Sequence, residues 1–268
     1  MITIQKYVRA QSLEEAYDLL QKNKRNRIIG GMLWLKMTGV NVPTAIDLCD
    51  LGLDTIEETE DAFSIGAMVS LRQLELHPAF NAYTQQAAAD AVKDIVGVQF
   101  RNMATVGGSI FGRFGFSDVL TVFLAMDTYV ELYKEGIVPL AEFAARAKKE
   151  RDILVRLIVK KRPGKFAYAA MRNSRTDFPV MAVAVSSMDG QYRAVYGARP
   201  ARAMVLTDEN GLLAGGVTAE SAAAFAAWAE ETIPTGGNAR AGAEYRSHLV
   251  GVLTRRALLD MGGNEHGN

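Results

Sequence analysis

The stretch "RNMATVGGSIFGRFGFSD", residues 101–118, places two adjacent glycines between β-branched and small residues, where a strand would carry side chains. Glycine inside or at the end of a strand marks a bulge, a tight bend or a close approach of a ligand to the backbone. A second pair, Gly30 and Gly31, follows the apolar run "RII". The two pairs therefore predict either structural turns or two loops that share one ligand.

Backbone N–H groups at a glycine pair can form a cradle for an anion, because each donor needs an acceptor and a phosphate oxygen supplies one. Neither "IIGGMLWL" (28–35) nor "TVGGSI" (105–110) has the GxGxxG or GxxxxGK[ST] spacing of the common nucleotide-binding motifs. Two pairs in one region, each after β-branched residues, make a shared diphosphate ligand as well supported as two turns.

Two further residues near these pairs each have two interpretations. Asp118 opens the apolar segment 117–127, which predicts a buried helix, so its carboxylate either stabilises the helix dipole or accepts hydrogen bonds from ribose hydroxyls. The spacing alone favours the role at the helix start. Trp34 is either a core or interface residue or a ring that stacks on a flat ligand.

Composition narrows the classes of function. The chain has 268 residues, of which 49% are hydrophobic, and 30 basic residues balance 30 acidic ones, so bulk charge gives no indication of a nucleic-acid partner. The single cysteine, Cys49, excludes an intrachain disulfide and an iron–sulfur cluster held by this chain alone. No run approaches the ~20 apolar residues of a membrane span, and the N-terminus has no signal pattern. We expect a cytoplasmic protein without a metal site of its own.

The two halves of the chain differ in pattern. The first mixes short apolar strands with helices, including a hairpin and helix over 128–145. From about residue 151, alternating segments predict antiparallel strands, and residues 218–233 and 243–261 predict long amphipathic helices. Charges cluster between the halves in "RAKKERD" (146–152), which is typical of a linker. The two halves therefore differ in their predicted arrangement of strands and helices.

The segment "QFRNMATVGGSIFGRFGFSDVLTVFLAMDTYVEL", residues 99–132, resembles the pattern Q-x-R-N-x-x-T-[IV]-G-G-N-[IL]…[SA]-D-x-x-x-x-L-x-A-L-x-A. That pattern is typical of the FAD-binding subunits of molybdenum hydroxylases, the flavoprotein partners in enzymes of the xanthine dehydrogenase and carbon monoxide dehydrogenase type. "FSIGAMVSLRQL" (63–74) and "EYRSHLVGVLTRRAL" (244–258) are similar to two further family motifs. The resemblance covers nearly the whole chain in order.

The resemblance implies a vanillyl-alcohol-oxidase-type (PCMH-type) FAD-binding module with two subdomains, followed by a small α+β domain with an antiparallel sheet and helices. The implied boundaries are 1–155 for the FAD-binding domain, with subdomains of about 1–55 and 56–155, and 156–268 for a C-terminal flavoprotein domain of the carbon monoxide dehydrogenase type. The cofactor-binding residues that it implies are Ile28, Ile29, Gly30, Gly31, Met32, Leu33, Trp34, Ile95, Thr105, Val106, Gly107, Gly108, Ser109, Asp118, Leu154 and Arg172.

The implied function is that of an FAD-binding electron-transfer subunit. Electrons would pass from [2Fe–2S] clusters of a partner subunit to FAD and then to NAD⁺ or another acceptor. The molybdenum cofactor would lie on a further subunit. No catalytic acid or base is implied, because the cofactor carries the redox chemistry.

Three departures from the family pattern keep two alternatives open. Met32 and Leu33 replace the polar residue that usually follows the first glycine pair, and Ser109 replaces an asparagine. Ala170 lies where a basic residue is common, and Arg172 is the nearest cation. The alternatives are a flavin-depleted scaffold or assembly subunit of such a complex, and a stand-alone flavin oxidoreductase.

Overall fold

The computed structural model describes residues 1–147 and 151–263. Contacts between Cα atoms divide the chain into two units, each built from separated segments. The first unit contains Met1–Gln73, Val98–Gly112 and Thr128–Lys161. The second unit contains Leu74–Gly97, Arg113–Asp127 and Arg162–Asn268. Each unit therefore depends on pairing between segments that lie far apart in the sequence.

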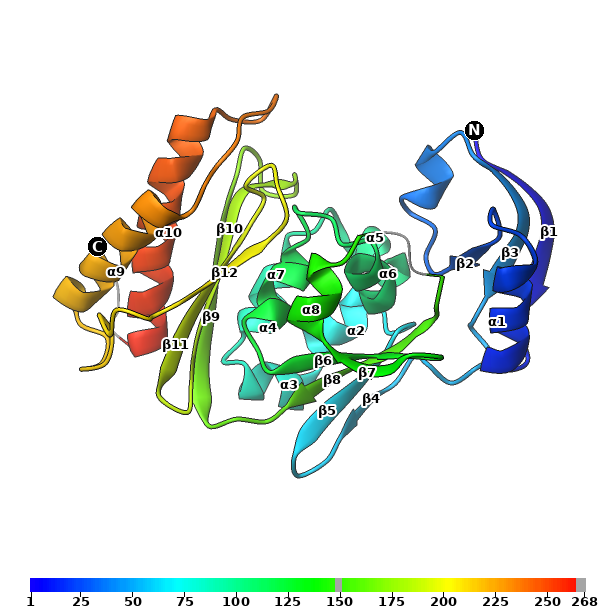
Figure 1. The fold of residues 1–268 in the computed structure, drawn as a ribbon, viewed down its shortest axis with the longest axis horizontal. Helices are drawn as coiled ribbons and strands as arrows, with labels where there is room; N and C mark the ends of the chain where they lie inside the picture. Colours follow the sequence, from blue (N-terminus) through cyan, green and yellow to red (C-terminus); the bar gives the residue numbers. More distant parts are fainter. Residues whose placement is uncertain (148–150, 264–268) are drawn as a thin grey trace. The chain divides into compact units, whose positions relative to one another are not determined.

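The first unit begins with a three-stranded parallel sheet that leads the chain into the first glycine pair (Figure 1). The helix α1 (Leu13–Lys22) begins at Ser12, whose side chain accepts a hydrogen bond from the N–H of Glu15 and so caps the helix. Buried Ala16 and Leu20 of this helix pack with Ile46 of the sheet. The strands, in the order β1-β3-β2, are β1 (Thr3–Arg9), β2 (Arg27–Ile29) and β3 (Asn41–Asp47).

The first unit also holds a five-stranded antiparallel sheet in the order β4-β5-β8-β6-β7. The predicted hairpin and helix over 128–145 are confirmed as β6, β7 and α8. The strand β8 pairs with β5 on one side and β6 on the other. The bounds are β4 (Ile56–Glu58), β5 (Ala62–Gly66), β6 (Thr128–Leu132), β7 (Gly136–Pro139), α8 (Leu140–Ala145) and β8 (Leu154–Lys160).

The segment that holds Gly107 and Gly108 begins a helix and does not end a strand. The interpretation of residues 105–110 as a strand end is therefore wrong. Thr105 caps the helix α6 (Val106–Phe111) by accepting a hydrogen bond from the N–H of Gly108 at 3.1 Å. The β-branched residues around the glycines suggested a strand, but the cap and the tertiary packing described below override that local preference. The neighbouring short helices of this unit are η1 (Leu35–Met37), α2 (Leu71–Leu76, shared with the second unit) and α5 (Val98–Met103).

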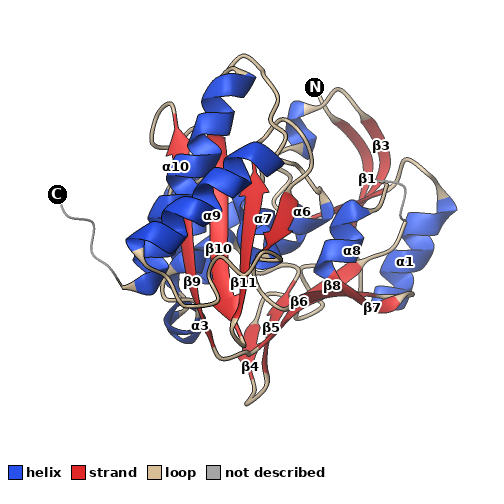
Figure 2. Cartoon of the chain, turned by 60° about the vertical axis from the view of Figure 1, so that its left-hand side comes forward, coloured by secondary structure: helices blue, strands red, loops and turns tan. Residues whose placement is uncertain are grey.

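The second unit is built on a four-stranded antiparallel sheet in the order β12-β11-β10-β9. Along β10, Val183 and Val185 face the helices α9 and α10, and alternate Ser186 donates its hydroxyl to the carbonyl of Ala125 beside α7. Figure 2 shows α9 and α10 along the sheet. The bounds are α3 (Pro78–Tyr83), α4 (Ala87–Lys93), α7 (Asp118–Leu124), β9 (Gly164–Arg172), β10 (Pro179–Met188), β11 (Gln191–Gly197), β12 (Met204–Thr207), α9 (Ala219–Thr232) and α10 (Ala243–Gly262).

The predicted antiparallel strands and two long helices of the second half are confirmed. The predicted buried helix that begins at Ser117 and Asp118 is also confirmed, with Ser117 as its cap. None of the helices formed by residues 1–147 and 151–263 combines the length and the apolar character that a bilayer crossing requires.

Candidate cofactor site

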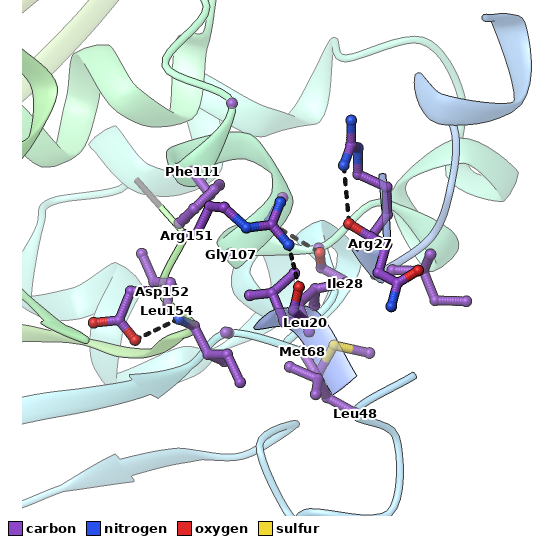
Figure 3. A pocket seen from close by; sticks show the side chains of 18 of the residues that line it. Leu20, Arg27, Ile28, Leu48, Met68, Gly107, Phe111, Arg151, Asp152 and Leu154 are labelled. Atoms are coloured by element: carbon purple, nitrogen blue, oxygen red, sulfur yellow. Dashed lines mark hydrogen bonds between the residues drawn. The ribbon is translucent and has the colours of Figure 1, made fainter. Parts of the chain in front are cut away.

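A cavity of about 610 Å³ lies within the first unit, at the end of β2 and beside the start of α6. This volume falls within the ~300–1,000 Å³ that ligand pockets usually span. Figure 3 shows how side chains from α1, β2, α6 and the start of β8 surround it. The predicted site residues that line it are Ile28, Ile29, Gly30, Thr105, Gly107, Gly108 and Leu154.

The loop after β2 presents backbone donors that nothing in the described chain uses. Among the described residues, none accepts a hydrogen bond from the N–H groups of Gly30, Gly31, Met32 or Leu33. These four residues are half-buried, and Gly30 lines the cavity. Consecutive unsatisfied N–H groups at a partly enclosed site require acceptors from water or a ligand, and an anion supplies them.

The backbone donors of the second glycine segment are already used inside the protein. The N–H of Val106 donates to the carbonyl of Val69 at 2.8 Å, and the N–H of Gly107 donates to the carbonyl of Ala67 at 2.9 Å. Gly108 donates to the Thr105 side chain, as described above. Thr105 to Ser109 remain predicted cofactor contacts, but the N–H groups of Val106 to Ser109 have protein acceptors.

Close backbone approach explains why the glycines are glycines. A Cβ on Gly31 would lie 1.8 Å from the carbonyl oxygen of Met103, and a Cβ on Gly30 would lie 2.6 Å from the Thr105 hydroxyl. A Cβ on Gly107 would lie 2.6 Å from the carbonyl oxygen of Ala67. The first glycine pair therefore packs directly against the chain that enters the second, and a side chain at Gly30 or Gly31 would separate the two segments.

The cavity carries more positive than negative charge. Lys24, Arg27 and Arg151 line it together with one carboxylate, Asp152. Figure 3 shows the side chains of Arg27 and Arg151 among the lining residues. The Asp152 carboxylate accepts hydrogen bonds from three backbone N–H groups, among them that of Lys134 at 3.1 Å, so its oxygens already have donors. An excess of cations beside free N–H groups favours an anionic ligand such as a diphosphate.

Arg151 also ties the start of β8 to the end of α1. Its guanidinium donates to the carbonyls of Leu20, Asn23 and Lys24, the last at 2.9 Å. These are carbonyls at the C-terminal end of the helix, which favours a cation there. Sequence reasoning missed Arg151, because it lies in the charged run that was interpreted as a linker. A cation directly before a predicted apolar strand was the signal that could have found it.

The side chains of two other predicted residues of the first loop, Met32 and Trp34, are not among those that line the cavity. Met32, which has a φ of 58°, packs against the cluster of Ile29, Val42 and Ala45. Trp34 is 39% exposed and directly precedes η1. Their side chains therefore belong to the packing and the surface of the parallel sheet, while their segment contributes backbone donors to the site.

In the second unit, the structure brings together two of the predicted residues, Asp118 and Arg172. Arg172 Nη2 donates to Asp118 Oδ1 at 2.8 Å, and the Tyr168 hydroxyl donates to the same oxygen. Both members of the ion pair are at least 90% buried in their side chains. Burial raises the pKa of Asp118, against the opposing effects of Arg172 and Tyr168, and burial also raises the pKa of Tyr168.

Asp118 thus has its predicted role in the first turn of a helix, and its carboxylate also neutralises a buried cation. Its predicted contact with a ribose stays a prediction. Ile95, also in the second unit, is half-buried just after α4, where its N–H donates to the carbonyl of Val92 at 2.9 Å. Its predicted contact with the flavin stays a prediction as well.

Comparison with known protein families identifies the chain. The family described as the FAD binding domain in molybdopterin dehydrogenase matches residues 2–160. The chain belongs to this family. A second family, the CO dehydrogenase flavoprotein C-terminal domain, matches residues 166–261. The predicted family, the predicted fold class and the predicted cofactor, FAD, are confirmed. The protein is thus an FAD-binding subunit of an oxidoreductase.

Relatives of known structure and function share this organisation. The chain is 25% identical to the nicotine 6-hydroxylase medium subunit of Paenarthrobacter nicotinovorans, over 96% of this chain and 97% of that one. The quinoline 2-oxidoreductase structure from Pseudomonas putida 86 superposes with a TM-score of 0.86 at 20% identity and covers 97% of each chain. The carbon monoxide dehydrogenase structure from Hydrogenophaga pseudoflava gives 0.85 at 23% identity and covers 96% of each chain.

Proposed function

We propose that the chain is the electron-transfer subunit of a multi-subunit molybdenum hydroxylase of the xanthine dehydrogenase type. Partner subunits hold the [2Fe–2S] clusters and the molybdenum cofactor, and NAD⁺ or another acceptor receives the electrons. The similarity to a hydroxylase medium subunit over nearly the full length of both chains supports this proposal. The single cysteine supports it as well, since a [2Fe–2S] cluster needs four protein ligands. A cytoplasmic location is part of the proposal.

The observation that carries the proposal is the row of unused N–H groups from Gly30 to Leu33 beside a cavity with three cations. These residues fit the diphosphate of FAD, because they supply several donors and positive charge without a side chain that blocks the approach. In this proposal, the backbone from Gly30 to Leu33 binds the diphosphate. Arg27 and Lys24 balance its charge.

The remaining residues of the first unit position the ligand. Arg151 fixes the end of α1 against β8, and Leu154 at the start of β8 provides an apolar wall. Thr105 holds the start of α6 through its hydroxyl. We include Ile95, Asp118 and Arg172 among the proposed contacts. Bound FAD supplies the redox chemistry, so the chain needs no acid or base of its own.

A matched pair of variants tests the anion site. Arg27→Gln removes a cation that lines the cavity, and Arg25→Gln removes an exposed cation just before β2 that does not line it. We expect Arg27→Gln to weaken FAD binding about fivefold, or about 1 kcal/mol, and Arg25→Gln to leave it unchanged. The measurement is titration of the apoprotein, copurified with its partner subunits, with FAD.

The same preparation tests the wider proposal. The complex should show the visible absorbance of bound flavin, and NADH should bleach it anaerobically if NAD⁺ is the acceptor. A folded complex that is colourless and takes up no added FAD would identify a scaffold subunit instead. Turnover of an organic substrate by this chain alone would identify a stand-alone flavin oxidoreductase.

A further inference from the structure

A second cavity, of about 320 Å³, lies in the second unit and takes no part in the proposed flavin site. Its walls come from the segment before α7, the start of β10, residues 198–201 and the first turn of α10. The side chains that give it chemical character are Phe116, Phe178, Arg240 and Arg246.

Arg246 is a buried cation whose protein partners are all neutral. It is 1% exposed. Its Nε donates to the carbonyl of Val180 at 2.8 Å, and its Nη1 donates to the carbonyls of Gly236 and Ala241 at 2.8 and 2.7 Å. Its Nη2 donates to Asn238 Oδ1 at 2.7 Å. A guanidinium has five N–H groups, so these four bonds leave one Nη2 donor over.

The charge of Arg246 has no counterion in the described chain. Among residues 1–147 and 151–263, no carboxylate lies within ion-pair distance of it. Burial lowers the pKa of Arg246, and the nearby Arg240 lowers it further. Arg246 is also in the first turn of α10, where the helix dipole disfavours a cation. Burying an unpaired charge is costly, so an anion in the adjacent cavity would relieve each of these penalties.

The second arginine, Arg240, has its own counterion, so the charge of Arg246 stays uncompensated. Arg240 Nη2 lies 3.2 Å from Asp177 Oδ1, so that carboxylate neutralises Arg240. The backbone N–H of Arg240 donates to the same Asn238 oxygen that accepts from Arg246. Asn238 therefore joins the two arginines at one edge of the cavity, and the net charge of the group is positive.

Two aromatic rings form an apolar wall beside these cations. Phe116 and Phe178 meet edge to face, with ring centroids 4.7 Å apart, and the Arg240 guanidinium lies 4.7 Å from the Phe178 centroid. A cavity of this size is at the lower end of the ~300–1,000 Å³ range of ligand pockets and suits a small molecule. Aromatic walls favour a flat ring, and the arginines favour a carboxylate, to which Arg246 can donate its remaining Nη2 N–H.

We propose that this cavity binds a small aromatic carboxylate. Its carboxylate group binds Arg246 and Arg240, and its ring packs against Phe116 and Phe178. None of the residues that line this cavity lines the cavity of the first unit or is among the proposed contacts with FAD.

Calorimetric titration of the full-length protein with four probes tests this site. Benzoate carries both features of the proposed ligand, benzamide carries the ring without the charge, acetate carries the carboxylate without the ring, and inorganic phosphate is a different anion. We expect saturable binding of benzoate, and binding at least about tenfold weaker for the other three. Binding of benzamide equal to that of benzoate, preference for phosphate, or no saturable benzoate binding would overturn the proposal.

Substitutions of the two arginines of the cavity test whether benzoate binds there. Arg240→Gln removes the exposed arginine of the cavity and is expected to weaken benzoate binding about tenfold. The control is Arg255→Gln, an exposed arginine further along α10 that does not line the cavity, which should leave benzoate affinity unchanged. Arg246→Lys keeps the charge and loses the planar donor set, so it should weaken binding as well. If that variant fails to fold, Arg240→Gln decides, and unchanged affinity in Arg240→Gln overturns the proposal.

Discussion

The loop at Gly30 and Gly31 lies against the chain that enters the helix start at Gly107 and Gly108, yet the backbone donors of the two glycine pairs differ in use. The first loop keeps four N–H groups without acceptors in the described chain, and the second segment gives its N–H groups to the protein. The first pair therefore combines close packing with free donors that can bind an anion, whereas the donors of the second pair serve the protein's own packing. Similar local sequences can thus serve ligand binding and architecture side by side.

The largest effect is expected from Gly31→Ala. The added Cβ would lie 1.8 Å from the backbone oxygen of Met103, which has no flexible side chain to move away, so the loop must shift. We expect a loss of about 3 kcal/mol in the free energy of unfolding, together with loss of bound FAD. Denaturant unfolding and the ratio of FAD to protein measure the two effects.

Gly39→Ala is the matched control for this variant. Gly39 lies in the same connection between β2 and β3, and its Cβ would meet nothing within 4 Å. It should leave stability and FAD content nearly unchanged. Equal tolerance of alanine at both positions would contradict the close approach of the first loop to Met103.

Gly107→Ala should have the second largest effect. Its Cβ would meet the carbonyl oxygen and the Cβ of Ala67, at 2.6 and 2.7 Å. We expect unfolding to become easier by about 2 kcal/mol, because the start of α6 must move away from that segment. Thermal unfolding of the variant checks this. A stability equal to that of the natural protein would show that this contact is not close in solution.

Thr105→Val tests the hydroxyl that caps α6. The valine keeps the shape of the buried side chain and removes the acceptor for the N–H of Gly108. The free energy of unfolding should fall by about 1 kcal/mol, as for other lost helix caps. Thr105→Ser, which keeps the hydroxyl, should retain most of that stability. A larger loss in Thr105→Ser than in Thr105→Val would assign the main effect to packing of the methyl group.

Local sequence signals predicted the parts of the fold that depend on neighbouring residues. The buried helix predicted over 117–127 begins at Ser117, and the hairpin over 128–145 forms as predicted. Local signals could not predict which acceptors bind the N–H groups of Val106 and Gly107, because those acceptors lie on a segment distant in the sequence. The family motif identified FAD at the level of the whole chain without showing which loop keeps its donors.

The same limit applies to charged residues. The start of α7 at Asp118 could be predicted, but its ion pair with Arg172 depends on where β9 packs. Arg151 was hidden in a charged run for the same reason, because its acceptors are the terminal carbonyls of α1. Pairing over long sequence distances decides which polar side chains remain available to a ligand.

The smallest effect on stability is expected from Gly108→Ala, which gives the sharpest separation of packing from ligand contact. Its Cβ would meet only the Thr105 hydroxyl, at 3.1 Å, and alanine favours a helix over glycine, so the free energy of unfolding should change by roughly 0.5 kcal/mol or less. Gly108 lines the cavity, so FAD affinity reports separately on the ligand. A stable variant that binds FAD normally would support the packing role of the second pair. A stable variant that has lost FAD would show that the cofactor itself meets the backbone at Gly108, and the contrast between the two glycine pairs would then be wrong.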